Sequence, residues 1–465
     1  MEFIHQPYIP GETIAAIATP PGEGGVAIIR ISGNLALDVA SKVFSGPVHS
    51  YRSHTAHFGK IHNEKGEHID DALVLVMLNK KSYTGESTVE IHCHGGSLVT
   101  RKVLEAILKA GARAALPGEF TFRAYMNGKM DLAQAEAVQE LICAKNDRAL
   151  QAAENQLKGN LSQRISTFQQ ALTQTAAILE AWVDFPEEGL EFTTLDEICA
   201  DLEKVTGEME KLANTFHDGK ILNDGISLCL IGCPNVGKSS LMNALLDKDR
   251  AIVSHIPGTT RDVLEESLRL NGLHFKLSDT AGIRETAENI EQEGIRRSKK
   301  AMNESDLILL VLDAHKGLDY EDEILLQQVP KEKTIIVWNK IDLWKEKGES
   351  IHSLLTGIKF PHVVHLSAKE RIGLENLHQA IDAVIWQNGH PPKDEIIITN
   401  VRHKEALNNA IMATQRVQIG LKQSLSPEFL TLDMRHCLSE LGKMIGTNIS
   451  EDILSAIFSK FCIGK

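Results

Sequence analysis

The chain has 465 residues, of which 43% are hydrophobic and 24% are charged, and its formal net charge is −13. At about 150 residues per domain, this length predicts roughly three domains. The composition is typical of a soluble globular protein, because no apolar run reaches the roughly 18 residues that a membrane span needs. The acidic balance argues against a stand-alone nucleic-acid binder, since such binding depends on Lys and Arg. A local basic patch or a basic partner would still allow the protein to act on RNA.

Cysteine usage and the N-terminus indicate where the protein works. The seven cysteines are scattered and odd in number, which favours a reducing cytoplasm over a disulfide framework or a zinc knuckle. The N-terminus has no basic segment ahead of an apolar run, so we expect no secretory signal. We therefore predict a cytoplasmic protein that does not interact with a membrane.

Short apolar runs separated by Gly and Pro turns fill the chain from about residue 10 to 125. The strands predicted there are Val26–Ile31, Ala72–Met77 and Val89–His92, and the predicted helix is Leu98–Leu108. This pattern indicates a mixed α+β domain, which we assign to residues 1–127. His92 and His94 share one face of their strand, but two ligands do not make a metal site, and we favour a structural role.

From Asp131 to about Trp182 the pattern is helical, and from Leu150 to Leu179 apolar residues recur about every 3.6 positions, which predicts a long helix packed in a bundle. Strands and helices then alternate from Ile226 to about Trp386, as in a doubly wound parallel sheet. The chain turns helical again through Ile396–Gln423 and Phe429–Lys460, and Ser450 is the expected N-cap of the last helix. We therefore predict an all-α domain in two parts, 128–222 and 387–465, interrupted by an inserted α/β domain at 223–386.

The predicted strand Ile226–Ile231 runs into the sequence GCPNVGKSS at Gly232–Ser240, which fits the phosphate-loop pattern G-x-x-x-x-G-K-S/T. The two glycines let backbone N–H groups turn inward around phosphates. Lys238 would reach the β and γ oxygens, and the Ser239 hydroxyl would bind Mg²⁺. The helix that starts here points its positive end at the phosphates. A phosphate-binding site is indicated.

Three later motifs, each at the end of a predicted strand, specify the base. Asp279–Gly282 (DTAG) supplies a carboxylate for the magnesium shell and a glycine N–H for the γ-phosphate. In Asn339–Asp342 (NKID), the carboxylate of Asp342 can accept hydrogen bonds from guanine N1 and N2, which adenine does not offer. Ser367–Lys369 (SAK) is the usual turn that supports the base. The order of the motifs predicts GTP rather than ATP.

Hydrolysis cannot follow the glutamine route of the small signalling GTPases. Apolar Ile283 stands where a water-positioning glutamine would follow the DTAG motif. Arg261 and Arg284 are candidates to stabilise the charge of the transition state. Alternatively, the carbonyl oxygen of the Asn235 side chain suits a monovalent metal ion placed where an arginine finger would go. Between the first two motifs, Thr260 of the PGTTRD segment is our choice to complete the magnesium shell.

Together these motifs resemble the translation-factor-like GTPases. Further segments make the chain similar to the MnmE (TrmE) family of tRNA-modification GTPases, from about residue 11 to the last lysine. They are Ala18–Gly33 (ATPPGEGGVAIIRISG), Gly118–Phe120 (GEF), Asn127–Ala137 (NGKMDLAQAEA) and Cys462–Lys465 (CIGK). The resemblance implies an N-terminal tetrahydrofolate-binding domain, a split helical domain and an inserted Ras-like P-loop GTPase domain. It also implies a homodimer through the N-terminal domains, and a heterotetramer with the FAD-dependent MnmG (GidA).

The resemblance further implies an activity. The family's pair of proteins adds an aminomethyl-type group, such as carboxymethylaminomethyl, at C5 of the wobble uridine of certain tRNAs. The one-carbon unit comes from a tetrahydrofolate (5,10-methylene or 5-formyl form), and GTP hydrolysis assisted by K⁺ drives the cycle. The sequence does not indicate whether glycine or ammonium is the amine donor. Two alternatives stay open: a non-catalytic GTP-dependent switch of the ribosome-assembly type, and a one-carbon transferase that GTP merely regulates.

The family's functional residues can be carried over to this sequence. For GTP they are Asn235, Val236, Gly237, Lys238, Ser239, Ser240, Ser254, His255, Ile256, Pro257, Gly258, Thr259, Thr260, Asp279, Thr280, Ala281, Gly282, Asn339, Lys340, Asp342, Ser367, Ala368 and Lys369. The implied Mg²⁺ ligands are Ser239 and Thr260, and the implied K⁺ ligands are Asn235, Ser254, Ile256 and Thr259. The implied folate contacts are Arg30, Glu90, Lys129 and Lys465. The implied catalytic residues are Lys238, Glu291, which would position the attacking water, and Cys462, whose role as nucleophile, carrier or positioning group stays open.

Overall fold

The computed structural model describes residues 11–185, 194–248, 267–270, 273–277, 302–343, 360–386, 389, 392 and 395–464. Contacts divide the chain into two compact units. The first comprises Met1–Ile142, Ala153–Lys211 and Arg402–Lys465, and the second comprises Cys143–Ala152 and Leu212–Val401. None of the helices in the described ranges is long and apolar enough to cross a membrane.

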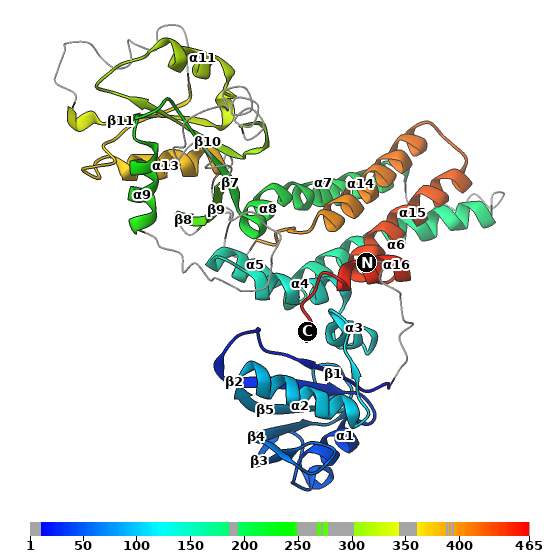
Figure 1. Ribbon diagram of the computed structural model, residues 1–465. Coiled ribbons are helices and arrows are strands. Elements are labelled where there is room, and N and C mark those ends of the chain that lie inside the picture. The colour runs from blue at the N-terminus through cyan, green and yellow to red at the C-terminus, as the bar shows by residue number, and fades with distance from the viewer. Residues whose placement is uncertain are drawn as a thin grey trace. The chain divides into compact units, whose positions relative to one another are not determined.

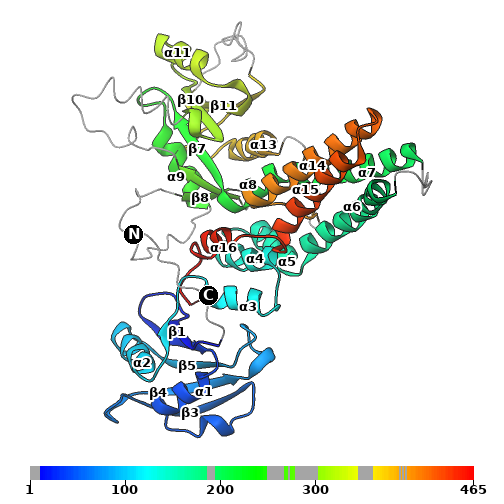
Figure 2. The same ribbon diagram turned by 90° about the vertical axis from the view of Figure 1, so that its right-hand side faces the viewer.

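A six-stranded sheet in the order β3-β4-β5-β2-β1-β6 forms the N-terminal part of the first unit (Figures 1 and 2). Its strands are β1 (Ile14–Ile17), β2 (Gly24–Ser32), β3 (Thr55–His62), β4 (His68–Met77), β5 (Thr88–Gly95) and β6 (Arg113–Ala114). Helices α1 (Ala36–Val43) and α2 (Ser97–Lys109) share one core with one face of this sheet. Because side chains alternate along a strand, Ile29 and Ile91 point into that core while Arg30 and Glu90 lie on the opposite face. The predicted α+β fold is confirmed.

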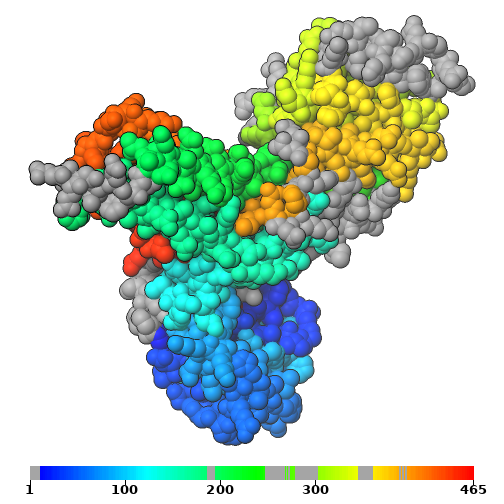
Figure 3. Space-filling model, turned by 180° about the vertical axis from the view of Figure 1, so that it is seen from behind, coloured from blue at the N-terminus to red at the C-terminus, as the bar shows by residue number. Residues whose placement is uncertain are grey.

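Helices make up the rest of the first unit. They are α3 (Glu119–Met126), α4 (Leu132–Cys143), α5 (Asp147–Leu157), α6 (Asn160–Asp184), α7 (Leu195–Asn214), α14 (Val401–Lys422), α15 (Pro427–Ile445) and α16 (Glu451–Phe458), although the first turns of α5 and the last residues of α7 belong to the second unit. Helices α7 and α14 lie side by side, green and orange in Figure 3, and are joined by contacts such as Gln418 to Thr206. The second part of the bundle thus pairs with the first, as predicted for a split helical domain.

The predicted long helix is interrupted in the structure. The expected long helix from Asp131 to Trp182 is broken into α4, α5 and α6, and Gly159, with φ of 87°, separates the last two. The helical stretch Phe429–Lys460 contains two helices, α15 and α16, and Gly446, with φ of 89°, ends the first. Glycine takes this left-handed conformation without steric cost and so ends a helix even where the apolar period continues. Ser450 is the N-cap of α16 as predicted, although its side chain makes no capping hydrogen bond.

The second unit contains a six-stranded sheet in the order β12-β11-β10-β7-β9-β8. Its strands are β7 (Ile226–Ile231), β8 (Ser267–Leu270), β9 (Leu273–Leu277), β10 (Leu307–Asp313), β11 (Thr334–Asn339) and β12 (His362–His365), and they are parallel apart from the antiparallel pair β8–β9. Helices α9 (Lys238–Lys248) and α13 (Leu374–Ile385) share a core with one face, and α11 (Tyr320–Gln328) with the other (Figure 1). The predicted doubly wound sheet is confirmed. Short 3₁₀ helices occur at Val48–Ser50, Asn79–Lys81, Lys331–Lys333 and Ile341–Leu343.

The chain enters this α/β sheet through α8 (Phe216–Asp224) and leaves it through residues 395–400, and these two segments touch. A Cβ atom on Gly219 of α8 would lie only 2.0 Å from the backbone oxygen of Ile398. The backbone N–H of Ile398 donates to the Thr215 hydroxyl at 3.0 Å. This contact fixes Ile398 outside a helix, which explains why α14 begins at Val401 and not at Ile396 as predicted. The finer division into four domain ranges stays a prediction.

Candidate functional site

The phosphate loop turns from the end of β7 into the start of α9, and its two glycines leave no room for a side chain. Gly232 has φ of 148°, and a Cβ atom there would lie 2.3 Å from the Val311 backbone oxygen. Gly237 has φ of 97°, and a Cβ atom there would lie 2.2 Å from Nδ2 of Asn339. Both positions therefore require glycine. This geometry fits a loop whose backbone N–H groups approach phosphate oxygens closely.

Lys238 and Ser239 stand in the first turn of α9, where the helix dipole favours anions. The ammonium of Lys238 donates to the backbone oxygens of Gly232 and Cys233, both at 2.8 Å, so its side chain folds back along the loop. Burial lowers the pKa of Lys238. Ser239 is exposed at the start of the helix. These positions fit a lysine that grips phosphate and a hydroxyl that binds its Mg²⁺.

Asn339 ties the phosphate loop to the turn that supports the base. Its side chain, at the end of β11, is 2% exposed. Nδ2 donates to the Val236 backbone oxygen at 2.9 Å, and Oδ1 accepts the Ala368 backbone N–H at 3.0 Å. In the same turn the Ser367 hydroxyl donates to Oδ1 of Asp342 at 2.6 Å. The carboxylate expected to read guanine is thus held in place by the motif that follows it, and the structure brings these predicted residues together.

Asp313, at the end of β10, is a site residue that the sequence analysis missed. The Lys340 ammonium donates to Oδ2 of Asp313 at 2.7 Å and to the Asn235 backbone oxygen at 2.6 Å. Burial acts to raise the pKa of Asp313, but hydrogen bonds from Lys340 and from the backbone N–H groups of His315 and Lys316 lower it below the usual value. Its position directly after an apolar strand was the signal that could have identified it. Lys340 therefore braces the phosphate loop from outside.

Several predicted residues lie outside the described part of the chain. They are Ser254, His255, Ile256, Pro257, Gly258, Thr259, Thr260, Asp279, Thr280, Ala281, Gly282 and Glu291, together with Arg261, Ile283, Arg284 and the final Lys465. Asn235 is described: it is exposed, with φ of 63°. Lys369 is also exposed. The second magnesium ligand, the potassium ligands and the water-positioning glutamate stay predictions.

A second polar site lies on the open face of the N-terminal sheet, where Arg30 of β2 stands directly opposite Glu90 of β5. Nε of Arg30 donates to Oε1 of Glu90 at 2.8 Å, and both side chains are largely buried. The aromatic rings of Tyr83 and Phe120 each lie with their centroids 5.6 Å from Cζ of Arg30. At this distance a guanidinium interacts favourably with an aromatic face. The two rings were not predicted, because nothing in the local pattern places them beside Arg30.

The C-terminal tail reaches this pair of charges. Nη1 of Arg30 donates to the Gly464 backbone oxygen at 3.4 Å, and Gly464 has φ of 95°. A Cβ atom on Gly464 would lie 2.3 Å from the Ile17 backbone oxygen, so the tail packs closely on the end of β1. The Gly118 N–H donates to the Cys462 backbone oxygen at 3.4 Å, and the Cys462 side chain is exposed. The predicted Arg30 and Glu90 are thus brought together, and Gly464 of the tail contacts Arg30. Among the predicted folate contacts, the Lys129 ammonium instead donates to the Lys80 backbone oxygen at 2.8 Å.

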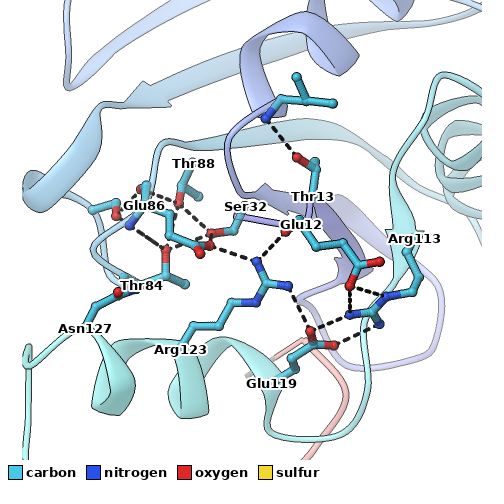
Figure 4. A network of polar contacts seen from close by, with 12 residues as sticks. Glu12, Thr13, Ser32, Thr84, Glu86, Thr88, Arg113, Glu119, Arg123 and Asn127 are labelled. Atoms are coloured by element: carbon cyan, nitrogen blue, oxygen red, sulfur yellow. Dashed lines mark hydrogen bonds and ion pairs between the residues drawn. The ribbon is translucent and has the colours of Figure 1, made fainter. Parts of the chain in front are cut away.

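A buried network holds α3, the helix that carries Phe120 (Figure 4). The fully buried Arg123 donates to Glu86 and Glu119, both at 2.9 Å. Arg113 also binds Glu119, at 2.7 Å. Burial acts to raise the pKa of Glu119, but the two arginines and the Leu116 N–H lower it, so its carboxylate stays ionised. The network joins residues distant in sequence and was not predicted.

His92 and His94 each have a carboxylate neighbour. Nε2 of His92 lies 3.6 Å from Oε2 of Glu90, and Nδ1 of His94 lies 2.8 Å from Oδ1 of Asp70. Both imidazoles occupy the face of β5 that Glu90 occupies, as the alternation predicted. The structural role that we favoured for these histidines stays a prediction.

Comparisons with known proteins place the whole chain. A family model described as "MnmE helical domain" matches residues 132–462, and one described as "GTP-binding protein TrmE N-terminus" matches residues 13–129. The tRNA modification GTPase MnmE of Protochlamydia amoebophila is 75% identical over 465 residues, with 100% of both chains covered. The protein of the same name from Moorella thermoacetica is 44% identical, with 98% of this chain and 99% of the relative covered.

Several solved structures resemble part of the chain. The crystal structure of Aquifex aeolicus Era bound to GDP·AlF4⁻ is 28% identical over 40% of this chain and 66% of that chain, at a TM-score of 0.27, too low to carry an argument. The full-length relatives and the two family models are sufficient by themselves to show the family. The chain belongs to the MnmE family of tRNA modification GTPases.

Proposed function

We propose that the protein, together with an FAD-dependent partner of the MnmG (GidA) type, adds an aminomethyl or carboxymethylaminomethyl group at C5 of the wobble uridine of certain tRNAs. The one-carbon unit would come from a methylene-tetrahydrofolate bound beside Arg30 and Glu90. The observation that supports this proposal best is the tail: the segment that carries Cys462 reaches the Arg30–Glu90 pair through Gly464. An exposed thiol and the residues that we propose to bind a folate are therefore both found in the first unit.

The chemistry of the second site suits a pterin. A pterin ring offers N–H donors along one edge, which a carboxylate such as Glu90 can accept. The rings of Tyr83 and Phe120 beside Arg30 supply flat apolar surface for a planar ligand. The glutamate portion of a folate is anionic and suits cations, for which Lys129 and Lys465 are our candidates. One-carbon chemistry would be supplied by the bound folate, while these residues bind and orient it.

The nucleotide site would drive the cycle. Ser239 and Thr260 would hold Mg²⁺, and Asn235 with the backbone oxygens of Ser254, Ile256 and Thr259 would hold K⁺. We propose that Glu291 positions the attacking water, since Ile283 has no group that can do so. The protein would act as a homodimer formed through the N-terminal domains. Membership in a family of tRNA modification GTPases argues against a pure assembly switch.

A cysteine substitution tests the proposal. Cys462→Ser should abolish wobble-uridine modification, measured by mass spectrometry of tRNA nucleosides, while GTP hydrolysis continues at the wild-type rate. Cys143→Ser is a matched control, because Cys143 is the other exposed cysteine among the described residues. This control should preserve both activities. Modification that persists in Cys462→Ser would refute the role of the tail, and loss in both variants would point to a general effect of losing a thiol.

A further inference from the structure

A thiol and two carboxylates gather where the phosphate loop meets the start of α11. Cys233 is the second residue of the loop, and its Sγ lies 3.9 Å from Oδ1 of Asp319. One potential ligand atom from each of Cys233, Asp319 and Asp322 lies within 4.8 Å of the other two. Cys233 is 8% exposed and Asp322 is 2% exposed. None of these three side chains is needed for the nucleotide contacts described above.

Asp322 is a buried carboxylate that lacks a cationic partner in the described contacts. Its Oδ2 accepts the Asp319 backbone N–H at 3.3 Å, as part of the capping box of α11. Its Oδ1 is buried and accepts no N–H or O–H hydrogen bond from the described residues. The hydrogen-bonding neighbour of this carboxylate at the cluster is the Cys233 thiol. The nearby ammonium of Lys316 instead reaches Oδ2 of Asp319, at 2.8 Å. A buried carboxylate without a compensating charge is costly, so a cation bound here would stabilise the fold.

We propose that Cys233, Asp319 and Asp322 bind a thiophilic divalent cation of the Zn²⁺ class. Sγ of Cys233, Oδ1 of Asp319 and Oδ1 of Asp322 would be the protein ligands, and water would complete a tetrahedron. Zn–S distances of about 2.3 Å and Zn–O distances of about 2.0–2.2 Å place sulfur and oxygen roughly 3.6 Å apart in such a site. The observed 3.9 Å between Sγ and Oδ1 of Asp319 is close to that value.

The proposed ligands favour Zn²⁺ over Mg²⁺, and metal binding would release one proton from the Cys233 thiol. A thiolate favours Zn²⁺ over Mg²⁺, which prefers oxygen ligands, so cellular Mg²⁺ would not compete effectively. Binding converts the Cys233 thiol to a thiolate and releases its proton to solvent, with no change of oxidation state. Oδ1 of Asp319 already accepts the Asp322 N–H at 3.0 Å and keeps a lone pair for the metal. The Lys316 ammonium occupies the other oxygen and helps to offset the negative charge.

The site would tie the phosphate loop to α11. The Cys233 backbone oxygen accepts the Lys238 ammonium, so a metal on the Cys233 side chain holds the residue against which Lys238 rests. The segment before α11 already supports the loop at Asn235. The Lys340 ammonium donates both to Asp313 and to the Asn235 backbone oxygen. The proposed ion therefore adds a second anchor between the same two segments.

Cobalt provides the test, because Co²⁺ bound to a thiolate shows a charge-transfer absorption that Zn²⁺ abolishes on displacing it. The full chain with GDP and Mg²⁺ is titrated with Co²⁺ and then with Zn²⁺. We expect one Co²⁺ with this absorption in the wild type, and its loss with one equivalent of Zn²⁺. Cys233→Ser and Asp322→Asn should each weaken Co²⁺ and Zn²⁺ binding by at least about 10-fold. Cys143→Ser, which removes an exposed cysteine, should bind both metals like the wild type.

The two variants protect the test against misfolding. Asp322→Asn keeps an oxygen that can accept the Asp319 N–H, so the capping box and α11 should survive, as circular dichroism can verify. If Cys233→Ser does not fold, Asp322→Asn decides the question. The proposal is overturned if the wild type shows no charge-transfer absorption, if Asp322→Asn binds Zn²⁺ as tightly as the wild type, or if Cys143→Ser is the variant that loses binding. In the first case the three side chains form only a hydrogen-bonded contact.

Discussion

Glu136 of α4 offers a quantitative test of how the helical part of the chain is held together. Its side chain is buried, with Oε2 only 2.8 Å from Nε2 of His403 and Oε1 accepting Nε of Arg402 at 3.1 Å. Both partners belong to α14. Burial acts to raise the pKa of Glu136, but the charges and hydrogen bonds of His403 and Arg402 outweigh it and lower the pKa from 4.5 to about 2.

The lowered pKa converts into stability. Each tenfold change in the acid dissociation constant is worth about 1.4 kcal/mol, so the interaction contributes about 3 kcal/mol to the free energy of unfolding. Because the folded pKa lies below the unfolded one, this contribution is fully present above pH 4.5 and disappears as the pH falls toward 2. Glu136→Gln keeps the shape but not the charge. It should therefore cost about 3 kcal/mol at neutral pH, and the difference from the wild type should shrink below pH 4.5.

Urea unfolding at a series of pH values measures this, with hydrogen–deuterium exchange of peptides from α4 and α14 reporting the local transition. Glu180→Gln is the matched control. Glu180 binds Arg435 at 2.9 Å between α6 and α15, but both side chains are well exposed, so this substitution should cost at most about 1 kcal/mol. An equal cost of Glu136→Gln at neutral and acidic pH would refute the electrostatic explanation, and no cost at neutral pH would refute the buried network itself.

Three further outcomes are expected. Asn339→Ala leaves two buried backbone groups unpaired, and each unpaired group costs about 1–3 kcal/mol. Titration with a fluorescent guanine nucleotide should therefore show at least a tenfold loss of affinity. Unchanged binding would contradict the role of Asn339 in joining the phosphate loop to the base-supporting turn. Gly464→Ala places a Cβ atom 2.3 Å from the Ile17 backbone oxygen, which should displace the tail. Calorimetry should then show weaker tetrahydrofolate binding, while GTP hydrolysis keeps its rate. Unchanged folate binding would refute the role of the tail. GTP hydrolysis should be faster in K⁺ than in Na⁺, and Glu291→Ala should slow it while nucleotide affinity stays nearly constant; equal rates in the two salts would eliminate the monovalent cation.

Sequence reasoning worked best where a ligand dictates residue type. Gly237, Lys238 and Asn339 could be assigned in advance because phosphate oxygens and guanine restrict what can stand at each strand end. The side chains that hold these residues in place are less constrained. Asp313 braces Lys340, but an acid after a strand is common and points to no particular partner. The sequence therefore predicts the motif residues but not the side chains that hold them in place.

Contacts between segments that are distant in the sequence could not be predicted either. The pairing of Arg30 with Glu90 depends on the register between β2 and β5, which no local pattern encodes, and these two residues were reached only through the family resemblance. The helix break at Gly159 escaped notice because the apolar period continues across it. The apolar period shows which face of a helix is buried. A single residue in the left-handed conformation can end the helix and redirect the chain while the apolar period continues.

The contact between Gly219 and Ile398 also concerns how such a protein can be rebuilt. Helix α8 and residues 395–400 already touch. A short linker after α8 could therefore replace everything between these two segments without moving either of them. By the same geometry, the excised GTPase module could be circularly permuted, or transplanted as one cassette into a surface loop of another host protein. A gene fusion at this point would have required no remodelling of the recipient fold.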